Sequence, residues 1–183
     1  MLGCGIRKIP PTLEDLMQIE RRHLIAVCCG VENLENMGGI IRAAAGFGAT
    51  ALLLGPACCD AFSRRALRVS MGSALNIPII EAGKDLSQML TTLRDQHHFN
   101  LVASILDNNA LRLRDCPTEG NVAVILGNED AGLDTEWLDL CSHRVTIPMH
   151  SGTDSLNVAV AAAVFMHHFA ENINDTATDT GDR

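Results

Sequence analysis

Polar side chains that could bind or activate a ligand are concentrated in three short stretches of the sequence. One is Ile147 to Asn157 (IPMHSGTDSLN), which carries hydroxyl, carboxylate and amide groups around a glycine. The other two span residues 33–42 and 127–132. Polar loops of this kind, set between apolar segments, are typical of a binding site carried by a rigid scaffold. We therefore expect the three stretches to form the walls of one site.

Several common chemistries do not fit these residues. Gly46-Phe47-Gly48 follows an expected helix rather than a strand, and the sequence contains no phosphate-binding loop that ends in Lys-Ser or Lys-Thr. Ser155 lacks the Gly-x-Ser-x-Gly setting of a hydrolase nucleophile. The seven cysteines include no Cys-x-x-Cys, and adjacent histidines do not chelate as an i, i+4 pair would. We expect no metal site.

The elements that must position the three stretches alternate between strand and helix. Apolar runs of strand length predict strands at 24–29, 50–54, 77–80, 101–106, 121–126 and 144–149. Helices are expected at 12–19, 37–47, within 60–76, and at 85–97, 134–141 and 155–170. This order predicts an α/β domain with a mostly parallel sheet and helices on both faces. Functional loops are then expected at the carboxyl ends of the strands.

Length and composition favour one domain. The chain has 183 residues, of which 47% are hydrophobic and 20% charged, enough for one substantial core. We assign residues 1–20 to an N-terminal arm, 21–171 to the domain, and 172–183 to a flexible tail. No run has the length of a membrane span, and the N-terminus does not resemble a secretory signal. Unpaired cysteines in two adjacent doublets indicate reduced thiols, so we expect a cytoplasmic protein without membrane contact.

The net charge of −8 argues against a protein that binds nucleic acid by its overall charge. A local basic cluster is nevertheless present, formed by Arg64, Arg65 and Arg68 on an expected helix. Arg65 and Arg68 are three positions apart and share a helix face. The charges alone leave two interpretations open, an RNA-binding patch or a solvated helix face.

The polar stretches, taken with their neighbours, resemble a known family. Residues 33–48 (NLENMGGIIRAAAGFG), 125–133 (ILGNEDAGL), and 147–149 through 155–158 are similar to the three ordered motifs of the SpoU (TrmH-type) RNA ribose 2′-O-methyltransferases of the SPOUT superfamily. Residues 68–72 (RVSMG) resemble the segment that links the first two motifs. The resemblance covers about residues 24–170, and three motifs in the right order are highly specific.

The resemblance implies a fold and a reaction that composition and periodicity do not reveal. The implied fold has a C-terminal deep trefoil knot, an exception to the usual rules of chain topology. The implied cofactor is S-adenosylmethionine, and the implied substrate is a ribose 2′-hydroxyl in tRNA or rRNA. The family also implies a homodimer whose interface contributes to the active site. The small-residue helices expected at 37–47 and 155–170 suit such an interface, although packing within the core would also explain them.

The resemblance also assigns roles to individual residues. Arg42 corresponds to the catalytic arginine and Asn36 to its polar partner, and the site is completed by Glu129, Ser155 and Asn157. The cofactor is expected to lie against Leu126, Gly127, Ile147, Met149 and Leu156. Arg64, Arg65 and Arg68 become candidate RNA contacts. Two roles for Arg42 stay open, because a guanidinium is normally protonated: it could act as the base or could bind the substrate phosphate and stabilise the developing alkoxide.

The chain departs from the family in two respects. Leu34 stands where a proline is common in the first motif, and the acidic chain lacks the extra recognition domain and basic extensions of many members. Two other functions therefore stay open. One is an RNA-binding protein of this fold with little or no catalytic activity, and the other is a methyltransferase that acts on a small molecule.

Overall fold

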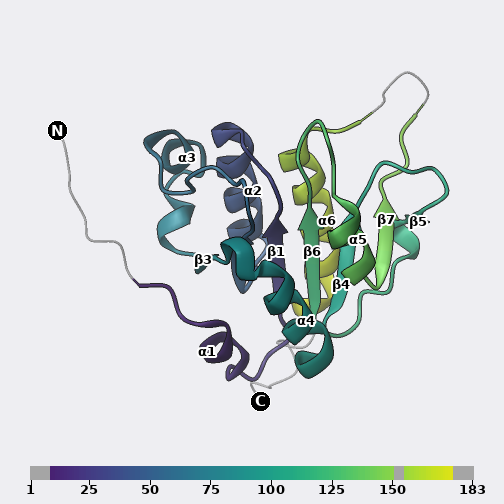
Figure 1. Ribbon diagram of the computed structural model, residues 1–183, viewed down its shortest axis with the longest axis horizontal. Helices are drawn as coiled ribbons and strands as arrows, with labels where there is room; N and C mark the ends of the chain where they lie inside the picture. The colour runs from purple at the N-terminus through teal and green to yellow at the C-terminus, as the bar shows by residue number, and fades with distance from the viewer. Residues whose placement is uncertain (1–8, 151–154, 175–183) are drawn as a thin grey trace, which may run out of the picture.

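A seven-stranded sheet forms the centre of the computed structural model, which describes residues 9–150 and 155–174 (Figure 1). The strand order is β3-β2-β1-β6-β4-β7-β5, and all six pairings between these strands are parallel. The strands are β1 (Leu24–Cys28), β2 (Ala51–Leu54), β3 (Ile79–Glu81), β4 (Asn100–Ser104), β5 (Leu111–Arg112), β6 (Val122–Leu126) and β7 (His143–Thr146). The predicted parallel α/β architecture is confirmed.

Helices cover both faces of the sheet. The α-helices are α1 (Leu13–Met17), α2 (Leu34–Gly46), α3 (Arg64–Val69), α4 (Leu86–His97), α5 (Thr135–Leu140) and α6 (Val158–Asn174), and short 3₁₀ turns span Ser73–Leu75, Gly83–Asp85 and Leu113–Asp115. Alternate strand side chains enter two separate cores, because successive residues point to opposite faces. Leu24 and Ala26 of β1 pack with α2 and α6, whereas Ile25 and Val27 pack with α1, α4 and α5.

Helix α2 lies between α3 and α6, and two glycines allow the close approach. A Cβ added at Gly38 would lie 2.7 Å from the Cβ of Val69 on α3. A Cβ added at Gly39 would lie 2.8 Å from the Cβ of Ala159 on α6. These two glycines of α2 therefore allow close packing within one chain, which is the second of the two explanations that the sequence left open.

Several element boundaries differ from the predictions, and three of the differences have a clear physical cause. The segment between the strands expected at 101–106 and 121–126 contains β5 and a 3₁₀ turn, which were not predicted because a two-residue strand leaves no periodic signal. Strand β7 ends at Thr146 rather than at Met149, ahead of Pro148, which cannot donate a backbone hydrogen bond. Helix α6 begins at Val158 rather than at Ser155, because the side chain of Asn157 accepts hydrogen bonds from the first amides of the helix.

The first described helix packs on the domain, and the last one extends past the expected end of the domain at residue 171. Thr12 and Asp15 form a capping box on α1, and Leu13 and Leu16 of this helix are buried against the domain. At the other end, α6 extends to Asn174, and residues 175–183 of the expected tail lie outside the described residues. The loop from β7 to α6 includes residues 151–154, also outside them. The knot and the domain limits 21–171 stay predictions.

Candidate active site

Three side chains from the three polar stretches form a continuous hydrogen-bonded chain. Asn157 donates from Nδ2 to Oδ1 of Asn36, at 2.8 Å, and Asn36 donates from Nδ2 to Oε1 of Glu129, at 2.7 Å. Asn36 lies on α2, Glu129 follows β6, and Asn157 precedes α6. The parallel sheet makes this possible, because loops that follow parallel strands meet at the same edge. The structure thus brings the three stretches together at the carboxyl ends of the strands.

A cavity of about 520 Å³ lies beside these three hydrogen-bonded side chains. It is lined by all five residues expected to hold the cofactor, namely Leu126, Gly127, Ile147, Met149 and Leu156. It is also lined by four of the five residues expected to be catalytic, namely Asn36, Glu129, Ser155 and Asn157. Its volume lies within the usual range for small-molecule and cofactor sites, roughly 300–1,000 Å³.

The loop 127–132 is folded tightly on itself and presents Glu129 to the cavity. The backbone groups of Asn128 and Gly132 exchange two hydrogen bonds of 2.9 and 3.0 Å. The side-chain oxygen of Asn128 accepts from the amides of Asp130 and Ala131, and its Nδ2 donates to the carbonyl of Gly30, at 2.8 Å. Asn128 therefore ties the loop both to itself and to the end of β1, which fixes the backbone on either side of Glu129.

Arg42 lies away from the cavity. It is exposed on α2, it is absent from the cavity lining, and its side chain makes no hydrogen bond or ion pair with any residue in the described ranges. At 100° per residue, the six positions from Asn36 to Arg42 turn the two side chains about 120° apart. A single chain therefore does not bring the expected catalytic arginine to the other candidate residues.

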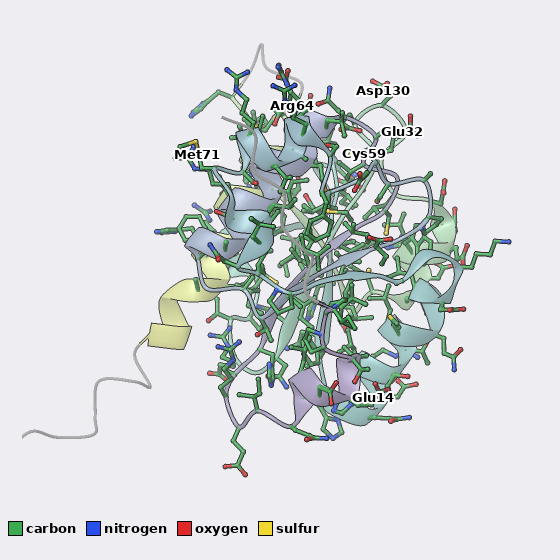
Figure 2. The ribbon with its side chains drawn as sticks, turned by 90° about the vertical axis from the view of Figure 1, so that its left-hand side faces the viewer. Glu14, Glu32, Cys59, Arg64, Met71 and Asp130 are labelled. Carbon is green, nitrogen blue, oxygen red and sulfur yellow. The ribbon has the colours of Figure 1, made fainter. Side chains whose placement is uncertain are left out.

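The basic cluster on α3 is exposed, but its three arginines differ. Arg65 forms an ion pair with Glu35 of α2. Within the described part of the chain, the side chains of Arg64 and Arg68 make no hydrogen bond or ion pair. Figure 2 shows Arg64 at the same end of the molecule as Asp130, with Glu14 at the opposite end. Two of the three predicted RNA contacts are thus free to meet an anion.

The environment of Glu129 includes several thiols. Burial raises the pKa of Cys28, Cys58 and Cys59, and the nearby carboxylate of Glu129 raises each of them further. These thiols are therefore neutral near pH 7 and add no charge to the site. All six cysteines in the described ranges are free.

Sequence reasoning missed the contribution of β4 to the cavity. Ser104, Ile105 and Leu106 line it from the end of that strand, and Leu133, Leu138 and Ala161 complete its apolar part. The position of residues 104–106 at the carboxyl end of a predicted parallel strand could have identified them. No group of three or more potential metal ligands is found among the residues that the structure covers, and no helix there is long and apolar enough to cross a membrane.

Comparison with known sequences gives a consistent group of relatives. The profile of the SpoU rRNA Methylase family matches residues 23–167. An uncharacterized tRNA/rRNA methyltransferase of Mycobacterium bovis is 42% identical over 165 residues, which are 88% of this chain and 56% of the relative. A Bacillus subtilis protein named 23S rRNA (guanosine(2553)-2′-O)-methyltransferase is 33% identical over 138 residues, 75% of this chain and 54% of that protein. The chain thus spans about half the length of these relatives.

Solved structures share the fold. An AdoMet-bound rRNA methyltransferase from Sinorhizobium meliloti superimposes with a TM-score of 0.75 at 28% identity, covering 86% of this chain and 60% of that one. The SpoU methyltransferase AviRb from Streptomyces viridochromogenes, in complex with AdoMet, gives a TM-score of 0.78 at 24% identity over 88% of this chain and 64% of the other. The second likeness concerns the fold alone.

Proposed function

Because the chain belongs to the SpoU rRNA methylase family, we propose that it is an S-adenosylmethionine-dependent methyltransferase that acts on a ribose 2′-hydroxyl in tRNA or rRNA. The observation that carries this proposal is the hydrogen-bonded chain from Asn157 through Asn36 to Glu129 on the wall of the cavity. Such an arrangement can orient a hydroxyl next to a bound donor, and orientation is the main contribution required for an in-line displacement.

The residues of the cavity suit S-adenosylmethionine. Apolar side chains, including Leu106, Leu133 and Ile147, can enclose an adenine ring, while Ser104 and Asp130 on the cavity wall offer partners for the polar and charged part of the donor. Ser155 lines the same wall as Asn157 and can hydrogen-bond the ligand or the substrate. When bound, the cofactor supplies an activated methyl group on a sulfonium. The chain's own residues hold and orient the reactants.

We also propose that two copies form a homodimer in which Arg42 of one protomer serves the cavity of the other. The position of Arg42 supports this, because the side chain is exposed and does not line the cavity of its own chain. The neighbouring surface of α6 exposes Val160 and Val164, which are 49% and 39% accessible and lie four positions apart on one helix face. In this arrangement Arg42 binds the substrate phosphate and stabilises the alkoxide as a cation.

The activity is tested with purified protein, tritiated donor and total tRNA or rRNA. We expect label in RNA, and digestion to nucleosides followed by mass spectrometry should place it on the ribose. Calorimetry with S-adenosylmethionine gives a separate measurement of binding. A folded protein that binds the donor but labels no RNA from the source cells would support the alternative RNA-binding or small-molecule functions. Lack of any binding would refute the proposal itself.

The role of Arg42 between subunits is tested with mixed dimers. Arg42→Ala removes the arginine, and Ile147→Trp is chosen to fill the cavity of its own chain. If Arg42 acts across the interface, a heterodimer of the two variants, purified with two affinity tags, retains one complete site and about half of the wild-type activity. If Arg42 acts within its own chain, both sites are defective and the heterodimer is inactive. Sedimentation of the wild-type protein as a monomer would exclude the dimer.

RNA contact is proposed for Arg64 and Arg68, with Arg65 held by its ion pair. Replacing a free phosphate contact with alanine weakens RNA binding at every sequence and lowers its dependence on salt. We expect Arg64→Ala and Arg68→Ala to reduce RNA affinity more than Arg65→Ala. Equal affinities for all four proteins would assign the cluster to a solvated helix face. The free thiols suit a reducing compartment, so we propose that these contacts are made in the cytoplasm.

A further inference from the structure

Methyl transfer requires that the ribose hydroxyl lose its proton. Arg42 is poorly suited to accept this proton. A ribose hydroxyl is a weak nucleophile, and its proton must leave as the new bond to carbon forms. The arginine is permanently protonated under ordinary conditions. It also lies outside the cavity of its own chain. Another group must therefore accept the proton.

We infer that Glu129 is the general base of the methyl transfer, an assignment that rests on the function proposed above. Its Oε1 accepts the hydrogen bond from Asn36 at 2.7 Å. Its other oxygen, Oε2, makes no hydrogen bond with the described residues and is available to the cavity that Glu129 lines. A carboxylate with one oxygen held and the other free has the arrangement of an oriented base.

The groups behind Glu129 fix its direction. Asn36 is itself held by Asn157, whose side-chain oxygen accepts from the amides of Ala159 and Val160 at 2.9 and 3.4 Å. On the other side, Asn128 anchors the loop to the carbonyl of Gly30. The carboxylate is thus held between helix α6 and strand β1, both of which pack in the same core. Asn36, Asn128 and Asn157 are positioning residues in this scheme.

The step conserves atoms and charge. Glu129 accepts the proton of the ribose hydroxyl on Oε2 as the ribose oxygen bonds to the methyl carbon, while the electron pair of the broken carbon–sulfur bond stays on sulfur. A carboxylate and a sulfonium become a neutral acid and a neutral thioether. Loss of two opposite charges is favoured in a site that excludes water, so a weak base is sufficient when it is well placed.

Three variants separate this role from a structural one. Glu129→Gln keeps an oxygen that can accept from Asn36 but cannot take a proton at neutral pH. We expect kcat to fall at least 100-fold, within the usual contribution of general base catalysis, while calorimetry shows donor affinity within about threefold of wild type. Glu32→Gln, the control, removes an exposed carboxylate that does not line the cavity, and should leave kcat within about threefold.

The third variant, Asn36→Asp, acts on the proposed base without removing it. It keeps the acceptor for Asn157 but places a second carboxylate next to Glu129, which disfavours ionisation of the pair. In the described part of the chain, Glu129 is near Asp130 on its own loop and the neutral thiols of Cys28, Cys58 and Cys59, while Glu35, the neighbour of Asn36 on α2, is paired with Arg65. We expect the acid limb of the pH dependence of kcat to move to higher pH in Asn36→Asp.

The outcomes distinguish this inference from the proposed function. Wild-type activity with an unchanged kcat in Glu129→Gln, or an acid limb that does not move in Asn36→Asp, would refute the base while leaving the methyltransferase intact. Loss of donor binding in Glu129→Gln would assign the carboxylate to cofactor binding instead. Absence of methyl transfer by the wild-type protein would refute the function first. As a readout independent of turnover, carbon-13 NMR of labelled glutamate carboxyl groups should show one resonance whose titration shifts to higher pH in Asn36→Asp.

Discussion

The substitution Gly127→Ala tests whether the loop that presents Glu129 must be closed. A Cβ added there would lie 2.4 Å from the carbonyl oxygen of Gly132, 2.5 Å from its carbonyl carbon, and 2.8 Å from the amide nitrogen of Leu133. All three neighbours are backbone atoms, so no side chain can rotate away. The loop of Gly127→Ala must therefore open.

The cost of opening follows from the bonds that close the loop. The two backbone hydrogen bonds between Asn128 and Gly132 are lost first. At about 1 kcal/mol each, their loss lowers the free energy of unfolding by about 2 kcal/mol, or about 4–8 °C in melting temperature. If the cofactor requires the closed loop, an opening of this size weakens the apparent affinity by about 30-fold.

Calorimetry with S-adenosylmethionine and thermal unfolding measure the two effects. Gly83→Ala is the control, because Gly83 has φ +51° and nothing within 4 Å of the added Cβ. It should lose about 1–2 kcal/mol of stability through left-handed backbone strain but keep wild-type affinity. Wild-type stability and affinity in Gly127→Ala would refute the close approach of the loop. An equal loss of affinity in both variants would show that general destabilisation, not the loop, is responsible.

Three further predictions concern the rest of the fold. His23 is 3% exposed, and burial lowers its pKa, so below about pH 6.5 the unfolded chain binds more protons than the folded one. The free energy of unfolding should therefore fall as the pH drops through this value. Urea titrations at several pH values should show a weaker dependence of this free energy on pH in His23→Gln. Leu16 is 4% exposed, so Leu16→Ala should lower the free energy of unfolding, measured by chemical denaturation, by about 2–5 kcal/mol. Ile19 is 48% exposed, so Ile19→Ala should lower it by less than about 1 kcal/mol. Burial raises the pKa of Cys116 to about 11, and partial burial raises the pKa of Cys141 to about 12. Both thiols should therefore react slowly with Ellman's reagent at pH 8 and rapidly after unfolding. Rapid reaction in the native protein would contradict these raised pKa values.

The elements that could be predicted are those with a continuous local signal. Strands β1, β2 and β6 are short apolar runs, and all their residues are buried, as a strand covered on both faces requires. Helix α4 shows Leu86, Leu90 and Leu93 at helical spacing, and all three enter the core. The order of the strands in the sheet, by contrast, has no local signal in the sequence. It depends on pairings such as β1 with β6, which are almost 100 residues apart, and no local pattern contains them.

The candidate site was predicted in composition but not in arrangement. The motifs identified the side chains of the hydrogen-bonded chain, yet the sequence alone did not show that Asn36 joins Asn157 to Glu129. The separation of Arg42 from these residues could have been expected, because helical geometry already turns it away from Asn36. Asn128 was overlooked because its contribution consists of five hydrogen bonds to backbone groups, three through its side chain and two through its own amide and carbonyl.

The hydrogen-bonded chain has a consequence for how the protein matures. Its two bonds join residues that are 121 and 93 positions apart in the sequence. Contacts of such long range form late, because a large loop must close before they contribute. Until α6 has been synthesised and has docked against α2, Asn36 lacks its partner and the carboxylate is not aligned. A nascent or partly folded chain therefore lacks the aligned site, and the assembled hydrogen-bonded chain itself reports that folding is complete.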